Sequence, residues 1–101
     1  MPYSLAAMFL ILVVAIAHST RADVDKGAQI AGQWCANCHV VGPSPKSAVT
    51  DGPPSFQAIA RSGMAPDQLR AFLSHPHGEM PDLALTRAEI DDLIGYITTL
   101  R

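Results

Sequence analysis

The chain has 101 residues and a formal net charge of -2, so we expect one domain and no extended basic surface for nucleic acid or anionic lipid. Its hydrophobic content is 49%, but the apolar residues are unevenly distributed because an uncharged run occupies residues 5–17. The remainder of the chain is short, and so small a domain often needs a metal, a disulfide or a cofactor to complete its core.

The apolar run over residues 5–17 indicates an export signal. It is shorter than the roughly 20 residues of a membrane-spanning helix and fits the roughly 7–15 residues of a secretory h-region. Ala22 is a small residue directly before Asp23, so we expect a cleaved leader over residues 1–22 and a mature domain over residues 23–101. Cleavage after Ala17 and retention of the run as an N-terminal anchor are the alternatives, and both also export the domain.

Helical patterns account for most of the mature domain. Helices are expected over residues 23–34, where Asp23 can cap the first turn, over residues 55–61 and over residues 66–73. A last helix begins at the capping box Thr86-x-x-Glu89 and continues to the C-terminus with apolar residues at helical spacing. Segments rich in proline and glycine separate these helices, and no alternating strand pattern occurs, so the fold class is all-α.

The segment Cys35-Ala36-Asn37-Cys38-His39 is a C-x-x-C-H motif, which is typical of covalent haem attachment. Two cysteines three positions apart can each form a thioether with one haem vinyl group. The histidine that follows then faces the iron, where a neutral imidazole nitrogen is a suitable axial ligand. The motif therefore predicts one haem c, bound by Cys35 and Cys38 and ligated by His39.

Three other uses of the two cysteines are less favoured by the sequence. A thioredoxin-like dithiol normally follows a strand in a βαβ unit, and no such unit is predicted. A structural zinc site requires four ligands, but the chain has 2 cysteines and no second pair of metal ligands at the usual spacing. A disulfide between Cys35 and Cys38 would close too small a loop to stabilise the fold much.

Four residues are candidates for the second axial ligand of the iron. Met80 is favoured because it lies in the loop before the last helix, and its thioether would raise the reduction potential and close the coordination sphere. Met64 lies in a turn between two short helices, where a core methionine is the more common role. His75 and His77 are loop histidines, which are more often solvated than ligating.

Several segments in the expected order resemble the class I (monohaem) cytochromes c in their short bacterial form. Residues 23–39 look like the first helix of that family running into its haem motif. Gly52-Pro53 resembles the Gly-Pro pair that follows the haem loop, and Met80-Pro81 resembles the axial methionine segment. Residues 93–97 look like the terminal helix.

The resemblance implies a fold of three to five helices wrapped around one covalent haem. It implies that the carbonyl of Pro53 accepts a hydrogen bond from His39 and orients that ligand. It also implies that Gly27 allows the first and last helices to approach closely, with Tyr96 packed against Gly27. The site residues implied for the cofactor are therefore Cys35, Cys38, His39, Pro53 and Met80, of which His39 and Met80 bind the metal.

These expectations favour a one-electron carrier, not an enzyme. The carrier would be periplasmic and monomeric, and it would not remain inserted in the membrane after leader cleavage. Its partners would be redox proteins that dock transiently at the haem edge. The alternatives are a haem-bearing subunit tightly bound to a periplasmic dehydrogenase and a haem protein with an open ligand-binding site.

Overall fold

The computed structural model describes residues 21–43, 52–75 and 78–101. The expected leader therefore lies almost entirely outside the described residues, as does His77. Within the described part of the chain, no helix is both long and apolar enough to cross a membrane.

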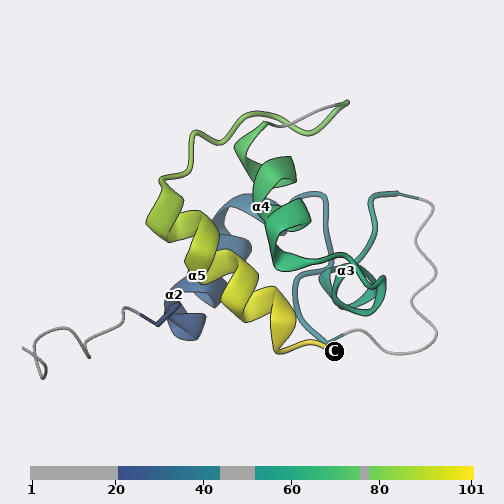
Figure 1. The fold of residues 1–101 in the computed structure, drawn as a ribbon. Coiled ribbons are helices and arrows are strands. Elements are labelled where there is room, and N and C mark those ends of the chain that lie inside the picture. Colours follow the sequence, from purple (N-terminus) through teal and green to yellow (C-terminus); the bar gives the residue numbers. More distant parts are fainter. Residues whose placement is uncertain (1–20, 44–51, 76–77) are drawn as a thin grey trace, which may run out of the picture.

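The described residues form five helical elements, in the order α2, η1, α3, α4 and α5 (Figure 1). Their bounds are Val24–Ile30 for α2, Ala31–Cys35 for the π-helical turn η1, Phe56–Arg61 for α3, Pro66–Ser74 for α4 and Arg87–Thr98 for α5. The described segments contain no strand, which confirms the all-α prediction. All four predicted helices are present, and their ends agree with the expectation to within a few residues.

The helices begin at residues whose side chains satisfy free backbone N–H groups. The Asp23 carboxylate accepts a hydrogen bond from the Lys26 N–H at 3.0 Å and caps α2. The Ser55 hydroxyl accepts from the Ala58 N–H at 3.1 Å and caps α3. These caps fix the positions at which α2 and α3 begin.

The capping box that the sequence predicts is formed at α5. The Thr86 hydroxyl accepts from the Glu89 N–H at 3.2 Å, and the Thr86 N–H donates to the Glu89 carboxylate at 2.9 Å. The latter hydrogen bond lowers the pKa of Glu89 because it stabilises the charged carboxylate. The start of the last helix is thus fixed by its own side chains.

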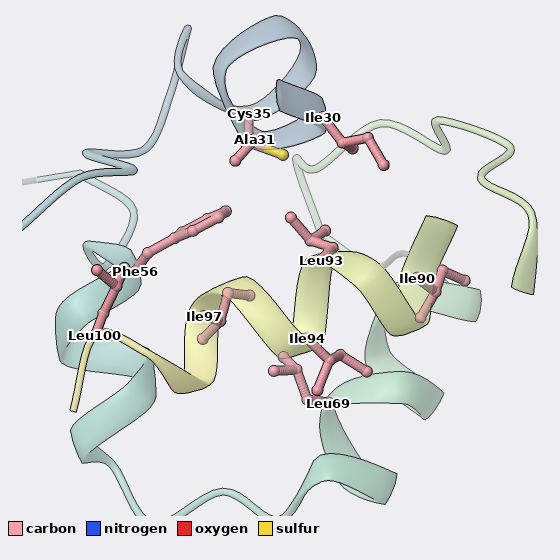
Figure 2. Packing of buried hydrophobic residues seen from close by; sticks show 10 residues of the cluster. All are labelled: Ile30, Ala31, Cys35, Phe56, Leu69, Ile90, Leu93, Ile94, Ile97 and Leu100. Carbon is pink, nitrogen blue, oxygen red and sulfur yellow. The ribbon is translucent and has the colours of Figure 1, made fainter. Parts of the chain in front are cut away.

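The hydrophobic core is built around α5. Figure 2 shows that side chains from α5 face residues of α2 and η1 on one side and Leu69 of α4 on another, while Phe56 points toward Cys35. Leu93 is the most deeply buried large side chain, with 1% of its surface exposed. The cluster comprises Ile30, Ala31, Cys35, Phe56, Leu69, Ile90, Leu93, Ile94, Ile97 and Leu100. The core therefore includes one cysteine of the haem-attachment motif.

An ion pair adds a polar link between α4 and α5. The Arg70 guanidinium donates through Nε to the Asp91 carboxylate at 2.9 Å, and it also contacts Asp67 at 2.7 Å. Asp67 is almost fully solvated and Asp91 is half-buried, so the stabilising part of this link is the contact between Arg70 and Asp91.

The helices α2 and α5 approach each other closely at Gly27. A Cβ atom at position 27 would overlap the carbonyl oxygen of Asp92 and would lie 2.9 Å from the Cβ of Tyr96. Figure 1 shows α2 crossing behind α5. The expected packing of Tyr96 against Gly27 is thereby confirmed, and glycine is the residue that permits it.

The crossing gives a first prediction. Gly27→Ala should destabilise the protein by about 3 kcal/mol, because the added methyl group meets backbone and cannot be accommodated by a side-chain rotation. Gly32→Ala is the matched control: Gly32 lies in η1, and an added Cβ there has no neighbour within 4 Å. Denaturant unfolding should show less than about 1 kcal/mol of change in the control. Equal effects in the two variants would contradict the account of the crossing.

Candidate functional site

The haem-attachment motif begins where a π-helical turn ends the first helix. The Ala36 N–H donates to the carbonyl of Ala31 at 3.0 Å, which is the wide hydrogen bond that defines η1. The next hydrogen bonds are tighter, since the N–H groups of Cys38 and His39 both donate to the carbonyl of Cys35, at 3.2 and 2.9 Å. His39 therefore follows Cys35 by one turn, which brings their side chains toward the same side of the backbone.

The two cysteines of the motif differ in their surroundings. Cys35 has 6% of its surface exposed, and Figure 2 shows its sulfur directed into the core between the first helix and α5. Burial raises the pKa of the Cys35 thiol because the thiolate would be poorly solvated there. Cys38 is exposed, and the two cysteines do not form a disulfide with each other. One attachment point thus belongs to the core and the other to the surface.

His39 is oriented by a hydrogen bond to a proline carbonyl. Its Nδ1 atom lies 2.7 Å from the carbonyl oxygen of Pro54. When Nδ1 carries the proton and donates to this oxygen, the lone pair of Nε2 remains available for a metal. The half-buried imidazole thus has a defined tautomer and a defined orientation for ligation.

The acceptor is Pro54, so the expectation that Pro53 has this role is wrong by one residue. The cause lies in the start of α3. Ser55 is the N-cap of that helix, and the Phe56 N–H donates to the Val40 carbonyl at 2.9 Å. These contacts hold the start of α3 against the segment after the motif. The carbonyl of Pro54, directly before the N-cap, therefore faces His39. The N-cap at Ser55 is the sequence feature that could have identified Pro54, and not Pro53, as the acceptor.

Two aromatic rings connect His39 to α5. The rings of His39 and Phe56 have centroids 5.5 Å apart and are tilted by 54°. The Phe56 ring lies 6.5 Å from that of Tyr96, tilted by 56°. The Tyr96 hydroxyl donates a hydrogen bond to the Val41 carbonyl at 2.6 Å. Tyr96 therefore packs on Gly27 and also fixes the backbone just after His39, a second contact that the sequence did not indicate.

The other candidate ligands lie on separate segments. Met80 is half-buried in the segment that joins α4 to α5.

Met64 has 39% of its surface exposed between α3 and α4, so the expectation that it is a core methionine is wrong. A tight turn at Gly63, whose φ of 81° requires a residue without a side chain, leaves Met64 at the surface. His75 is exposed at the end of α4. The contacts thus unite Cys35, His39 and Pro54, while Met80 belongs to another part of the chain.

The comparisons with known proteins agree on one family. The family model described as cytochrome c oxidase, cbb3-type, subunit III matches residues 22–97. The chain is 40% identical over 100 residues to cytochrome c-552 of Bradyrhizobium diazoefficiens (strain JCM 10833 / BCRC 13528 / IAM 13628 / NBRC 14792 / USDA 110), covering 96% of this chain and 95% of that protein. No solved structure matches the chain with significance. The chain belongs to the class I c-type cytochromes, in their short bacterial form.

A c-type cytochrome contains covalently bound haem c, and the residues of this chain fit that group. The motif has one buried and one exposed cysteine side chain. Its imidazole is hydrogen-bonded at Nδ1 to a backbone carbonyl, which leaves Nε2 for the iron. Sulfur and imidazole nitrogen are the donors that haem c requires. The apolar residues around Cys35 also suit a cofactor whose faces are apolar.

The contact between α5 and the segment after the motif gives a second prediction. Tyr96→Phe keeps the Cβ atom on Gly27 and the ring near Phe56 but removes the hydrogen bond to Val41. This cytochrome variant should lose about 1–2 kcal/mol of stability in denaturant unfolding, because the Val41 carbonyl is left without its donor.

Thr99→Val is the matched control for Tyr96→Phe. It removes an exposed hydroxyl at the C-cap of α5 that donates to the Tyr96 carbonyl at 2.6 Å. An exposed carbonyl can bind water instead, so the control should lose less than about 0.5 kcal/mol. A Tyr96→Phe variant as stable as the wild type would show that the Val41 contact contributes nothing.

Proposed function

We propose that this c-type cytochrome is a soluble periplasmic carrier of single electrons with one haem, held by Cys35 and Cys38 and ligated by His39 and Met80. The observation that carries the proposal is the hydrogen bond between His39 Nδ1 and the Pro54 carbonyl, because it prepares the imidazole of a C-x-x-C-H motif for an iron. When bound, the haem supplies an iron that cycles between two oxidation states one unit apart.

The chain's own residues keep the geometry of such a site constant. Pro54 holds His39 from one side, and the Phe56 ring supports it from another. The Phe56 N–H and the Tyr96 hydroxyl donate to the carbonyls of Val40 and Val41 and fix the segment that follows His39. A ligand that moves little between two charge states keeps the reorganisation of the site small, which favours rapid electron exchange over substrate chemistry.

Met80 is proposed as the second axial ligand because of its place in the chain and its partial burial. It lies before the capping box of α5, in a segment anchored at both ends by helices. A thioether ligand raises the reduction potential and leaves no open position for a substrate or a gas. An iron with both axial positions occupied by the protein distinguishes an electron carrier from a ligand-binding haem protein.

Export and partner docking complete the proposal. We propose that the leader over residues 1–22 is removed and that residues 23–101 act as a monomer in the periplasm. Acidic residues outnumber basic ones in the chain, so docking onto a redox partner should depend on salt. The exposed Trp34, 51% accessible and next to Cys35, is available for such a contact.

A second candidate is a haem-bearing subunit that stays bound to a larger periplasmic oxidoreductase, such as a dehydrogenase. The description of the matching family model, which names an oxidase subunit, favours it. The similar length of the chain and of its relative, a protein named only as a cytochrome, favours the free carrier. Purification at high salt separates the two: the carrier is recovered alone, whereas a permanent subunit is recovered with its partner.

The assignment of Met80 gives a third prediction. Oxidised wild-type protein should show a weak sulfur-to-iron charge-transfer band at the red end of the spectrum, and Met80→Ala should abolish it. The reduced variant should also bind carbon monoxide at neutral pH, which the wild type should resist because its iron has no open position.

Met64→Ala is the control for the methionine assignment, since Met64 is exposed on a different segment. It should retain the band and should not bind carbon monoxide. If Met64→Ala abolishes the band while Met80→Ala retains it, the two methionines have been assigned the wrong way round. If the wild type has no band, neither methionine is the ligand.

A further inference from the structure

The residue expected to begin the mature chain is hydrogen-bonded through its main-chain nitrogen to the last helix. The Asp23 N–H donates to the carboxylate of Asp92 at 2.8 Å. The partners are 69 positions apart in sequence, so this contact joins the start of α2 to the middle of α5. Ala22, the residue before Asp23, is the expected site of leader cleavage.

We propose that leader removal after Ala22 converts this hydrogen bond into an ion pair between the new α-ammonium group of Asp23 and the carboxylate of Asp92. A leader peptidase hydrolyses the bond between the Ala22 carbonyl carbon and the Asp23 nitrogen. Water supplies the hydroxyl group of the new Ala22 carboxyl terminus and a proton to the nitrogen. The amine that results, with an ordinary pKa of about 7.7–8.0, takes up a further proton at neutral pH and becomes charged.

Asp92 is the acceptor available to this ammonium. The carboxylate of Asp23 itself already accepts the Lys26 N–H and caps α2. An ammonium at this position opposes the dipole of the first helix, whose N-terminus carries partial positive charge. The carboxylate of Asp92 offsets that cost, and a charge-assisted hydrogen bond is stronger than the amide contact it replaces. Processing should therefore strengthen the crossing of α2 and α5 beside Gly27.

Gly95 provides a second, independent observation at the same place. A Cβ atom at position 95 would lie 2.8 Å from the Cβ of Ala22, and its next neighbour would be Val24 Cγ2 at 3.9 Å. Ala22 is thus the residue that makes a larger side chain at position 95 unfavourable. Once Ala22 has left with the leader, only an ordinary contact with Val24 remains.

The test begins with N-terminal sequencing of the exported holoprotein, which should start at Asp23. Asp92→Asn keeps the acceptor oxygen but removes the charge. The effect of Asp92→Asn on the folding equilibrium constant is then measured in the processed protein and in the same protein acetylated at its α-amine. The variant should lower the folding equilibrium constant about two- to fivefold more in the free-amine form than in the acetylated form. Asp91→Asn disturbs the ion pair with Arg70 instead, so it should lower the folding equilibrium constant equally in the free-amine and the acetylated protein.

Gly95→Ala supplies a readout that does not depend on charge. In the processed protein it should raise the folding equilibrium constant about two- to fivefold, as alanine does in place of glycine inside a helix. A mature chain that starts at any other residue overturns the proposal. An equal effect of Asp92→Asn in both forms, or a destabilising Gly95→Ala, also overturns it. None of these results bears on the spectrum that tests the role of Met80.

Discussion

The close approach of α2 and α5 at Gly27 is the constraint on which the rest of this structure depends. Because position 27 has no side chain, the backbone of α5 at Asp92 and the Cβ atom of Tyr96 pack directly on the first helix. The haem-attachment motif follows from the end of that helix through a single π-helical turn. The position of the motif relative to α5 is therefore set by backbone contact, which leaves little freedom for adjustment by side-chain rotation.

Tyr96 connects this helix crossing to His39, the proposed axial ligand. Its Cβ atom packs on Gly27, its ring lies near that of Phe56, and its hydroxyl donates a hydrogen bond to the Val41 carbonyl. Phe56 in turn lies against His39, whose Nδ1 atom is held by the Pro54 carbonyl. Helix crossing, ring packing and ligand orientation are thus parts of one contact network. A c-type cytochrome gains from such a network because its iron must change charge without a large change in the surroundings.

Much of this could be predicted from the sequence, and the failures have physical causes. Apolar spacing and caps predicted the helices because these are local properties, and the motif predicted the haem because its chemistry depends on local spacing. The acceptor was assigned to Pro53 because the resemblance rests on the Gly-Pro pair, and the N-cap at Ser55, which places the Pro54 carbonyl next to His39, was not used. Met64 was misplaced because a turn at Gly63, not the methionine's own hydrophobicity, decides its exposure. The hydrogen bond from Tyr96 to Val41 joins residues far apart in sequence, and no local pattern encodes it.

The central claim is that Cys35, Cys38 and His39 hold one haem that exchanges one electron at a time. A potentiometric titration of the exported protein, followed by its visible absorption, tests this claim most directly. The account predicts one reversible step that fits a one-electron Nernst curve, with the same midpoint potential in the reducing and oxidising directions. A curve that needs two components, a step of two electrons, or an absorption spectrum that does not change with potential would contradict it.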